Sequence, residues 1–144
     1  MRSRVCVDAS LVIWALTPSP LSPIARALLA RWLEDGVALV APSLFAFEVT
    51  STLRRLVYHK ELTAAEGEEA FEKFLKLPVY LANRRGIYPL AWQLAKELNR
   101  ARAYDTAYLA LAQIAGCELW TADRRLYNAA CAKYPWVKWV EDSA

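Results

Sequence analysis

Four acidic residues interrupt or end apolar segments of the 144-residue chain, namely Asp8, Glu48, Asp105 and Asp123. Asp8, for example, directly follows Val5-Cys6-Val7. An unpaired carboxylate in an apolar interior costs several kcal/mol or shifts its pKa, so each of the four needs a compensating partner. Their positions make them candidates for a shared chemical site.

Carboxylates brought together repel one another unless a positive charge neutralises them. The chain has one histidine, His59, and its three cysteines lack metal-binding spacing. Oxygen-only ligands favour a hard cation, Mg²⁺ or Mn²⁺. Such ions keep several waters, polarise a phosphoryl group and can turn a bound water into a nucleophile. The chemistry predicted from these residues is hydrolysis of a phosphodiester bond.

A purely structural explanation of the four acids also stands at this point. Asp105 and Asp123 can each cap a helix. Glu48 can pair with Arg54 or Arg55, which follow it in the same predicted helix. Any one acid alone is better explained this way, so the catalytic hypothesis depends on all four converging.

The elements that must position these acids alternate between strand and helix patterns, which predicts an α/β fold with parallel strands. Strands are predicted at residues 5–7, 37–41, 118–121 and 137–140. Helices are predicted at 23–35, from the cap Ser43 through Val57, from the capping box Thr63/Glu66 to Pro78, from Pro89 through Leu98, and from Tyr104 to Gly116.

This arrangement brings the acids to one edge. Asp8 and Asp123 follow two predicted parallel strands, and ligands of open α/β sheets bind at the carboxyl ends of the strands. Glu48 and Asp105 fall near the starts of helices that begin at the same edge in right-handed strand–helix units. All four acids are therefore predicted to converge.

Composition sets the remaining bounds. With 56% hydrophobic residues, we expect residues 1–144 to form a single domain. The longest uncharged stretch, 36–47, is shorter than the ~18 residues of a membrane span, and the start, Met1-Arg2-Ser3-Arg4, lacks a signal-peptide pattern. We expect a cytoplasmic protein with no membrane contact. Its three cysteines read as core residues, and the net charge of +3 leaves nucleic-acid binding open.

Four segments taken together resemble the PIN-domain family: Val7-Asp8-Ala9-Ser10, residues 42–55 with Glu48, residues 104–112 with Asp105, and residues 119–126 with Asp123. Their order, spacing and compact length are similar to VapC-type toxins of toxin-antitoxin pairs. The resemblance covers nearly the whole chain. It implies a three-layer α/β/α domain with a central, mainly parallel sheet of about four to five strands.

The resemblance also implies an Mg²⁺-dependent endoribonuclease, with Mn²⁺ as a possible substitute, that cleaves RNA through a metal-activated water. Asp8, Glu48 and Asp105 would hold the ion and Asp123 would complete the acidic set. Ser10 and Thr121 would be supporting hydroxyls. The family often has asparagine where this chain has Ser51, so hydrogen bonding around Glu48 can differ.

Partners implied by the resemblance are an RNA substrate, a cognate antitoxin protein that inserts a basic side chain among the carboxylates, and a second copy in a homodimer. Helices carrying Trp32, Phe45, Phe47, Phe71 and Phe74 form either plain core or an antitoxin groove. Arginines at 84–85, 100, 102 and 124–125 are candidates for phosphate contact. Tyr104 is expected in the core, and Trp14 either in the core or against a base.

Two rival functions remain open on the residues alone. A non-catalytic PIN-like module would bind RNA or a protein and keep its carboxylates for folding. A phosphotransfer domain would use Asp8 as acceptor, but haloacid-dehalogenase-like enzymes have an acid at the place of Ser10, and receiver domains have an acid before the strand aspartate. The complete four-acid set favours the nuclease.

Overall fold

The computed structural model describes residues 3–143 and contains one five-stranded sheet, in which every strand is parallel to its neighbours. The strands are β1 (Arg4–Val7), β2 (Ala38–Pro42), β3 (Val79–Ala82), β4 (Glu118–Thr121) and β5 (Val137–Trp139), in the spatial order β3-β2-β1-β4-β5. The helices are α1 (Ala9–Leu16), α2 (Ser22–Glu34), α3 (Leu44–Tyr58), α4 (Ala64–Lys76), α5 (Ile87–Glu97), α6 (Tyr104–Ala115) and α7 (Arg124–Ala130), followed by a 3-10 turn, η1 (Val140–Ser143).

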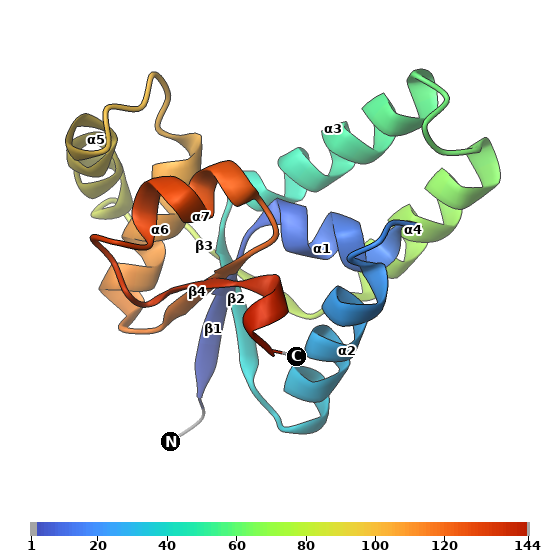
Figure 1. Ribbon diagram of the computed structural model, residues 1–144, viewed down its shortest axis with the longest axis horizontal. Coiled ribbons are helices and arrows are strands. Elements are labelled where there is room, and N and C mark those ends of the chain that lie inside the picture. The colour runs from blue at the N-terminus through green and yellow to red at the C-terminus, as the bar shows by residue number, and fades with distance from the viewer. Residues whose placement is uncertain (1–2, 144) are drawn as a thin grey trace.

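Helices cover both faces of the sheet, which confirms the predicted three-layer α/β/α architecture (Figure 1). The helices α1, α2, α3 and α4 lie together on one side, with α3 and α4 extending outward as a helical pair. On the other side α6 packs against β1, β2 and β4, and α5 packs on α6. From β1 the chain adds β2 and then β3 on one side, and it then crosses back to add β4 and β5 on the other side of β1. The topological switch point therefore lies between β1 and β4.

Local sequence signals account for most helix boundaries. Thr63 and Glu66 form the predicted capping box at α4, in which each side chain accepts a hydrogen bond from the other residue's backbone N–H. Gly116 ends α6 in the left-handed conformation, at φ 65°, which favours glycine. Ser43 precedes α3 as expected, but its side chain makes no capping hydrogen bond.

Three elements were not predicted from the sequence. The helix α1 is short and most of its residues are buried, so it lacks the polar face that reveals a helical period. The edge strand β3 exposes Tyr80 and Leu81 and shows no alternation of apolar and polar residues. The seven-residue helix α7 is too short for a clear period.

The core confirms some expectations about apolar residues and corrects others. Trp32, Phe45 and Phe74 are buried, as plain core requires, whereas Phe47 is exposed. Among the cysteines, Cys6 is buried but Cys117 and Cys131 are only partly buried, so the core expectation holds for one of the three. Tyr104 is exposed and was wrongly expected in the core.

No helix within residues 3–143 is long and apolar enough to cross a membrane. The structure does not describe Met1, Arg2 and Ala144. The expectations about the first residues of the chain and about a single domain over residues 1–144 include these positions.

Candidate active site

The four sequence-predicted acids line one surface pocket of about 390 Å³ at the carboxyl edge of the sheet. Asp8 directly follows β1 and Asp123 lies two residues beyond β4, the two strands of the switch point. Glu48 comes from the second turn of α3, and Asp105 is the second residue of α6. Four segments far apart in the sequence therefore bring their carboxylates to one place.

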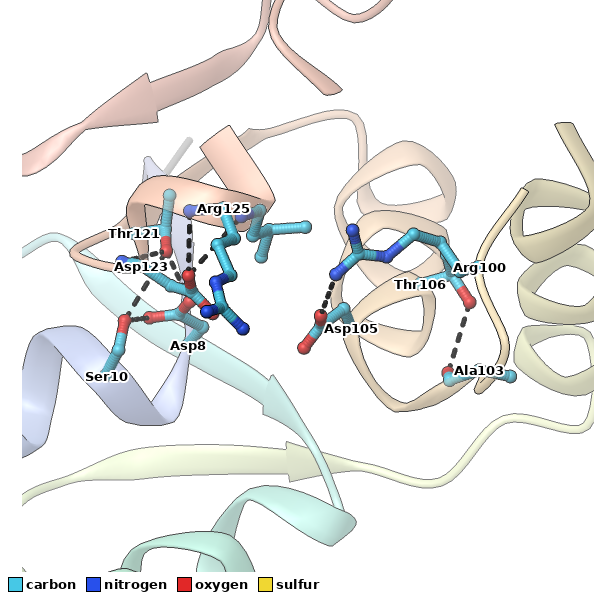
Figure 2. Close-up of polar contacts among 10 residues, drawn as sticks. Asp8, Ser10, Arg100, Ala103, Asp105, Thr106, Thr121, Asp123 and Arg125 are labelled. Atoms are coloured by element: carbon cyan, nitrogen blue, oxygen red, sulfur yellow. Dashed lines mark hydrogen bonds and ion pairs between the residues drawn. The ribbon is translucent and has the colours of Figure 1, made fainter. Parts of the chain in front are cut away.

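Asp8 is the most enclosed of the four, with 4% of its surface exposed. It is the N-cap of α1, where its Oδ1 accepts a hydrogen bond from the backbone N–H of Leu11 at 3.1 Å. The Ser10 hydroxyl donates to the same oxygen at 2.7 Å, and the Thr121 hydroxyl donates to Oδ2 (Figure 2). Both carboxylate oxygens are therefore fixed by the chain itself.

The two hydroxyls that support Asp8 also bind the loop after β4. Ser10 Oγ accepts from the backbone N–H of Ala122 at 3.1 Å, and Thr121 Oγ1 accepts from that of Asp123 at 2.9 Å. Each hydroxyl donates one hydrogen bond to Asp8 and accepts one from a backbone N–H of the loop. This arrangement links the start of α1 to the loop after β4, with Ser10 and Thr121 both in contact with Asp8.

Burial raises the pKa of Asp8 from 3.8 to about 6, because desolvation outweighs the three hydrogen bonds that lower it, and the nearby charge of Asp123 raises it further. Asp123 caps α7, its Oδ1 accepting from the backbone N–H groups of Arg125 and Leu126 at 3.0 and 3.4 Å. The helix-capping alternative therefore describes the geometry of Asp123, and this carboxylate still lines the pocket.

Asp105 has a different environment on the opposite side of the pocket. It does not cap α6, because Ala103 is the residue that precedes the helix. Its Oδ2 pairs with the guanidinium of Arg100 at 3.0 Å, and about a third of each side chain is exposed (Figure 2). This carboxylate is held by one surface ion pair.

Glu48 accepts a hydrogen bond from the hydroxyl of Tyr108, a buried residue one helical turn beyond Asp105. Burial raises the pKa of Glu48, the Tyr108 hydrogen bond lowers it, and the nearby charge of Asp105 raises it. Within residues 3–143, neither Arg54 nor Arg55 forms an ion pair with Glu48, so that structural alternative is wrong.

The pocket contains residues that sequence reasoning did not assign to it. Tyr108 lines the pocket, and its spacing of three residues from Asp105 is a signal that could have identified it. Glu61, in the turn after α3, also lines the pocket, and nothing in its sequence context indicates this. Trp14 lies on the pocket wall and is exposed, so its expected alternative place in the core is wrong.

The donor set fits a hard divalent cation that keeps part of its water shell. Five carboxylates and one arginine, Arg55, line this pocket, and no His or Cys lines it. The nearby charge of Asp123 raises the pKa of Asp8, and that of Asp105 raises the pKa of Glu48, as expected where negative charges gather. Residues 3–143 hold no trio of acidic, His or Cys side chains close enough to enclose a metal ion directly. A cation in this pocket would therefore be bound by some of these acids through water, as Mg²⁺ sites commonly allow.

Comparison with known proteins gives the family. A family model described as PIN domain matches residues 5–131. The chain is 36% identical over 119 residues to the ribonuclease VapC9 of Mycobacterium tuberculosis, covering 77% of this chain and 91% of that protein. It is 35% identical over 127 residues to VapC3 of the same organism, covering 88% and 87%. The crystal structure of PAE2754 from Pyrobaculum aerophilum superimposes with a TM-score of 0.66 at 20% identity, over 99% of this chain and 95% of that one.

Proposed function

The chain belongs to the PIN-domain family, and from this premise we propose that it is a divalent-metal-dependent endoribonuclease, the toxin of a toxin-antitoxin pair. We propose Mg²⁺ as its ion, with Mn²⁺ as a substitute. The sequence relatives that cover most of the chain are ribonucleases by name. The proposal treats residues 1–144 as a single PIN-like domain that works in the cytoplasm.

One observation carries the proposal: Asp8, Glu48, Asp105 and Asp123 line a single pocket at the switch point of the sheet. Carboxylates with purely structural roles are not expected to cluster, because each can be paired with a positive charge or a hydrogen-bond donor at its own position. Here the charge of Asp123 raises the pKa of Asp8, and the charge of Asp105 raises the pKa of Glu48. Such a cluster favours a site that receives a cation and a phosphate.

The proposed roles follow from how each side chain is held. Asp8 presents a fixed carboxylate, since Ser10, Thr121 and the backbone of Leu11 define its orientation. Glu48 is oriented by the Tyr108 hydroxyl, and Asp105 faces it from α6. Asp8, Glu48 and Asp105 would hold the cation and Asp123 would complete the set, directly or through water.

A bound divalent cation supplies the positive charge that neutralises the scissile phosphate and lowers the pKa of an attacking water. The chain's own carboxylates orient that cation and can accept the proton that the water releases. No serine, cysteine or histidine of the pocket is needed as a nucleophile. The pocket opens at the surface, so an RNA strand can approach without a conformational change in the sheet.

We propose three partners: an RNA substrate, a cognate antitoxin and a second copy of the chain in a homodimer. An antitoxin side chain of positive charge would pair with the carboxylates, as Arg100 already does with Asp105. Light scattering on the purified protein measures whether it is a dimer. Growth arrest on expression without a partner, relieved by Asp8→Asn, is the result expected of a toxin.

The function is tested by cleavage of a panel of fluorophore-quencher RNAs in Mg²⁺, Mn²⁺ or EDTA. An Asp105→Asn variant purified in parallel controls for contaminating nuclease. We expect cleavage with either metal, none in EDTA, and a loss of at least about 100-fold in the variant. Equal cleavage by both proteins would contradict the proposed site, and no cleavage of any RNA by the folded wild type would favour a non-catalytic PIN-like module.

A further inference from the structure

A second surface cavity, of about 500 Å³, lies between α5 and the start of α6, at the ends of β2 and β3. We call it the aromatic pocket. Three aromatic residues, Tyr88, Trp92 and Tyr104, and two arginines, Arg84 and Arg102, line it. Residues of α5, of the start of α6 and of the first turn of α3 form its walls.

The three aromatic side chains of this pocket are unusually exposed for their size. The exposed fraction is 69% for Trp92, 64% for Tyr88 and 58% for Tyr104. Packing of the fold does not require them there, since most of each ring remains in solvent. The Tyr88 hydroxyl donates to Asn83 at 3.0 Å, which restrains its ring. Clustered exposed aromatic rings of this kind mark a binding surface, and planar nucleobases are among the groups that stack on them.

The charge of the aromatic pocket is positive. Arg84 and Arg102 line it without any acidic residue, and neither takes part in an ion pair among residues 3–143. A further hollow, which Trp92 also lines, is lined by Lys96, Arg100 and Arg102, again without an acid. Aromatic rings interleaved with cations are the combination that binds single-stranded nucleic acid.

The aromatic pocket adjoins the candidate active site through the first turn of α6. Tyr104 lines the aromatic pocket, and the next residue, Asp105, lines the pocket that also contains Asp8, Glu48 and Asp123, which we call the acidic pocket. One turn further, Ala107 lines the aromatic pocket and Tyr108 lines the acidic pocket. The acidic pocket repels a polyanion except where a cation sits, so the RNA on either side of the cut must be held by other residues. The neighbouring cationic and aromatic surface meets that need.

From these contacts we propose that the aromatic pocket binds unpaired RNA beside the scissile phosphate, with bases stacked on Trp92, Tyr88 and Tyr104 and phosphates bound by Arg84 and Arg102. The inference rests on the proposed ribonuclease function and adds its substrate class. Bases in an A-form duplex are stacked on each other and cannot reach these rings, so the site selects single-stranded segments.

Binding is measured separately from cleavage, by fluorescence anisotropy of a fluorescein-labelled, unstructured RNA oligonucleotide in EDTA. We expect Trp92→Ala to weaken binding by roughly tenfold, the usual effect of removing a stacked ring. Tyr58→Ala is the matched control, since Tyr58 is also 69% exposed but lines neither pocket, and it should leave binding unchanged. Trp92→Phe keeps an aromatic ring and should retain most of the affinity, which excludes a folding defect.

Two further measurements define the ligand. Arg84→Gln should reduce the slope of log affinity against log salt by about 0.7, the share of one phosphate on a single strand. A duplex of the same sequence should bind wild type and Trp92→Ala equally. A duplex that loses as much affinity as the single strand would overturn the proposed selection of unpaired RNA.

Several results would overturn the proposal. One is equal RNA binding by wild type and Trp92→Ala. Another is a loss of binding that coincides with a change from dimer to monomer in light scattering, which would make the pocket a contact between copies. These outcomes separate the binding site from catalysis. If the protein cuts no RNA but its RNA binding depends on Trp92, the nuclease function is rejected and the binding site is retained. If the protein cuts RNA and the Trp92 substitutions change neither cleavage nor binding, the binding site is rejected and the nuclease function is retained.

Discussion

The two sides of the acidic pocket hold their carboxylates in opposite ways (Figure 2). On the sheet side, Asp8 is almost fully buried and receives hydrogen bonds from two hydroxyls and a backbone amide. On the helix side, Asp105 is a third exposed and has one arginine partner. The first carboxylate is fixed before any ligand arrives, and the second can exchange its partner for another cation.

This difference has an energetic origin. Asp8 stands at the switch point between β1 and β4, where its neighbours are fixed by the sheet, and its burial raises its pKa to about 6. An ionised group held in this way destabilises the cation-free fold. Asp105 contributes little to stability, because exposed ion pairs are worth about 0–1 kcal/mol. The carboxylate of Asp8 on the sheet side is therefore preorganised at a cost in folding stability. The carboxylate of Asp105 on the helix side can change its partner with almost no cost in stability.

The largest expected effect is on thermal stability in EDTA. Asp8→Asn removes the buried charge but keeps an oxygen that can cap α1. Since the folded-state pKa of Asp8 is about 6 against 3.8 ordinarily, its charge costs about 3 kcal/mol at pH 7. We expect the variant to melt roughly 10 °C higher than wild type, and Asp105→Asn to melt no more than about 3 °C lower. Differential scanning calorimetry measures both.

The same pair of proteins gives a pH test with a defined sign. Between about pH 4 and 6 the folded wild type binds a proton that the unfolded chain does not, so the penalty of Asp8 shrinks as the pH falls. The advantage of Asp8→Asn should therefore be full above pH 6 and vanish near pH 4. A variant that is less stable than wild type at pH 7, or an advantage that does not change with pH, would show that Asp8 is not strained by burial.

A smaller effect is expected at Glu48, which belongs to the helix side but is fixed by a hydrogen bond. Tyr108→Phe removes the donated hydroxyl that lowers the pKa of Glu48. The pKa of Glu48 should rise, so cleavage should fall roughly threefold to tenfold at neutral pH and the acidic limb of the pH–rate profile should move to higher pH.

The matched control for Tyr108→Phe is Tyr134→Phe. Tyr134 donates a comparable hydrogen bond, at 2.7 Å, to Glu97, and neither residue lines the acidic pocket. The control should cleave like wild type. An unshifted pH profile in Tyr108→Phe would mean that the Tyr108 hydroxyl only packs and does not position Glu48.

The smallest effect is expected at Arg100. Its guanidinium competes with a bound cation for Asp105, so Arg100→Gln should tighten Mn²⁺ binding by about twofold to fivefold, as expected from an exposed ion pair. Arg85→Gln, which removes an exposed arginine that forms no ion pair among residues 3–143, should leave the affinity unchanged. Weaker Mn²⁺ binding in Arg100→Gln would indicate that Arg100 orients Asp105 for the ion.

The sequence was sufficient to predict the parallel α/β architecture and the meeting of the four acids. Both follow from local signals, such as the Thr63/Glu66 capping box, combined with the handedness of strand–helix units. The elements that escaped prediction are those whose exposure pattern depends on tertiary neighbours. Helix α1 is buried on most sides, and β3 is an edge strand with exposed aromatic and apolar residues.

The partners of the acids were less predictable than the acids themselves. The contact between Tyr108 and Glu48 joins α6 to α3 across 60 positions of sequence, and no local pattern encodes it. The pairing of Asp105 with Arg100 depends on the path of the loop before α6. Tyr104 looked like a core residue because it stands next to an apolar run, but its position in the first turn directs it outward.

The most direct test of a single cation site shared by the two sides is calorimetric titration of Mn²⁺ into wild type, Asp8→Asn and Asp105→Asn at neutral pH. We expect the wild type to bind Mn²⁺ and each substitution to weaken binding by at least about tenfold, since each removes one charged oxygen ligand or its water-bridged equivalent. No binding by the wild type, or binding that survives both substitutions unchanged, would contradict a cation site built from the two sides of the pocket.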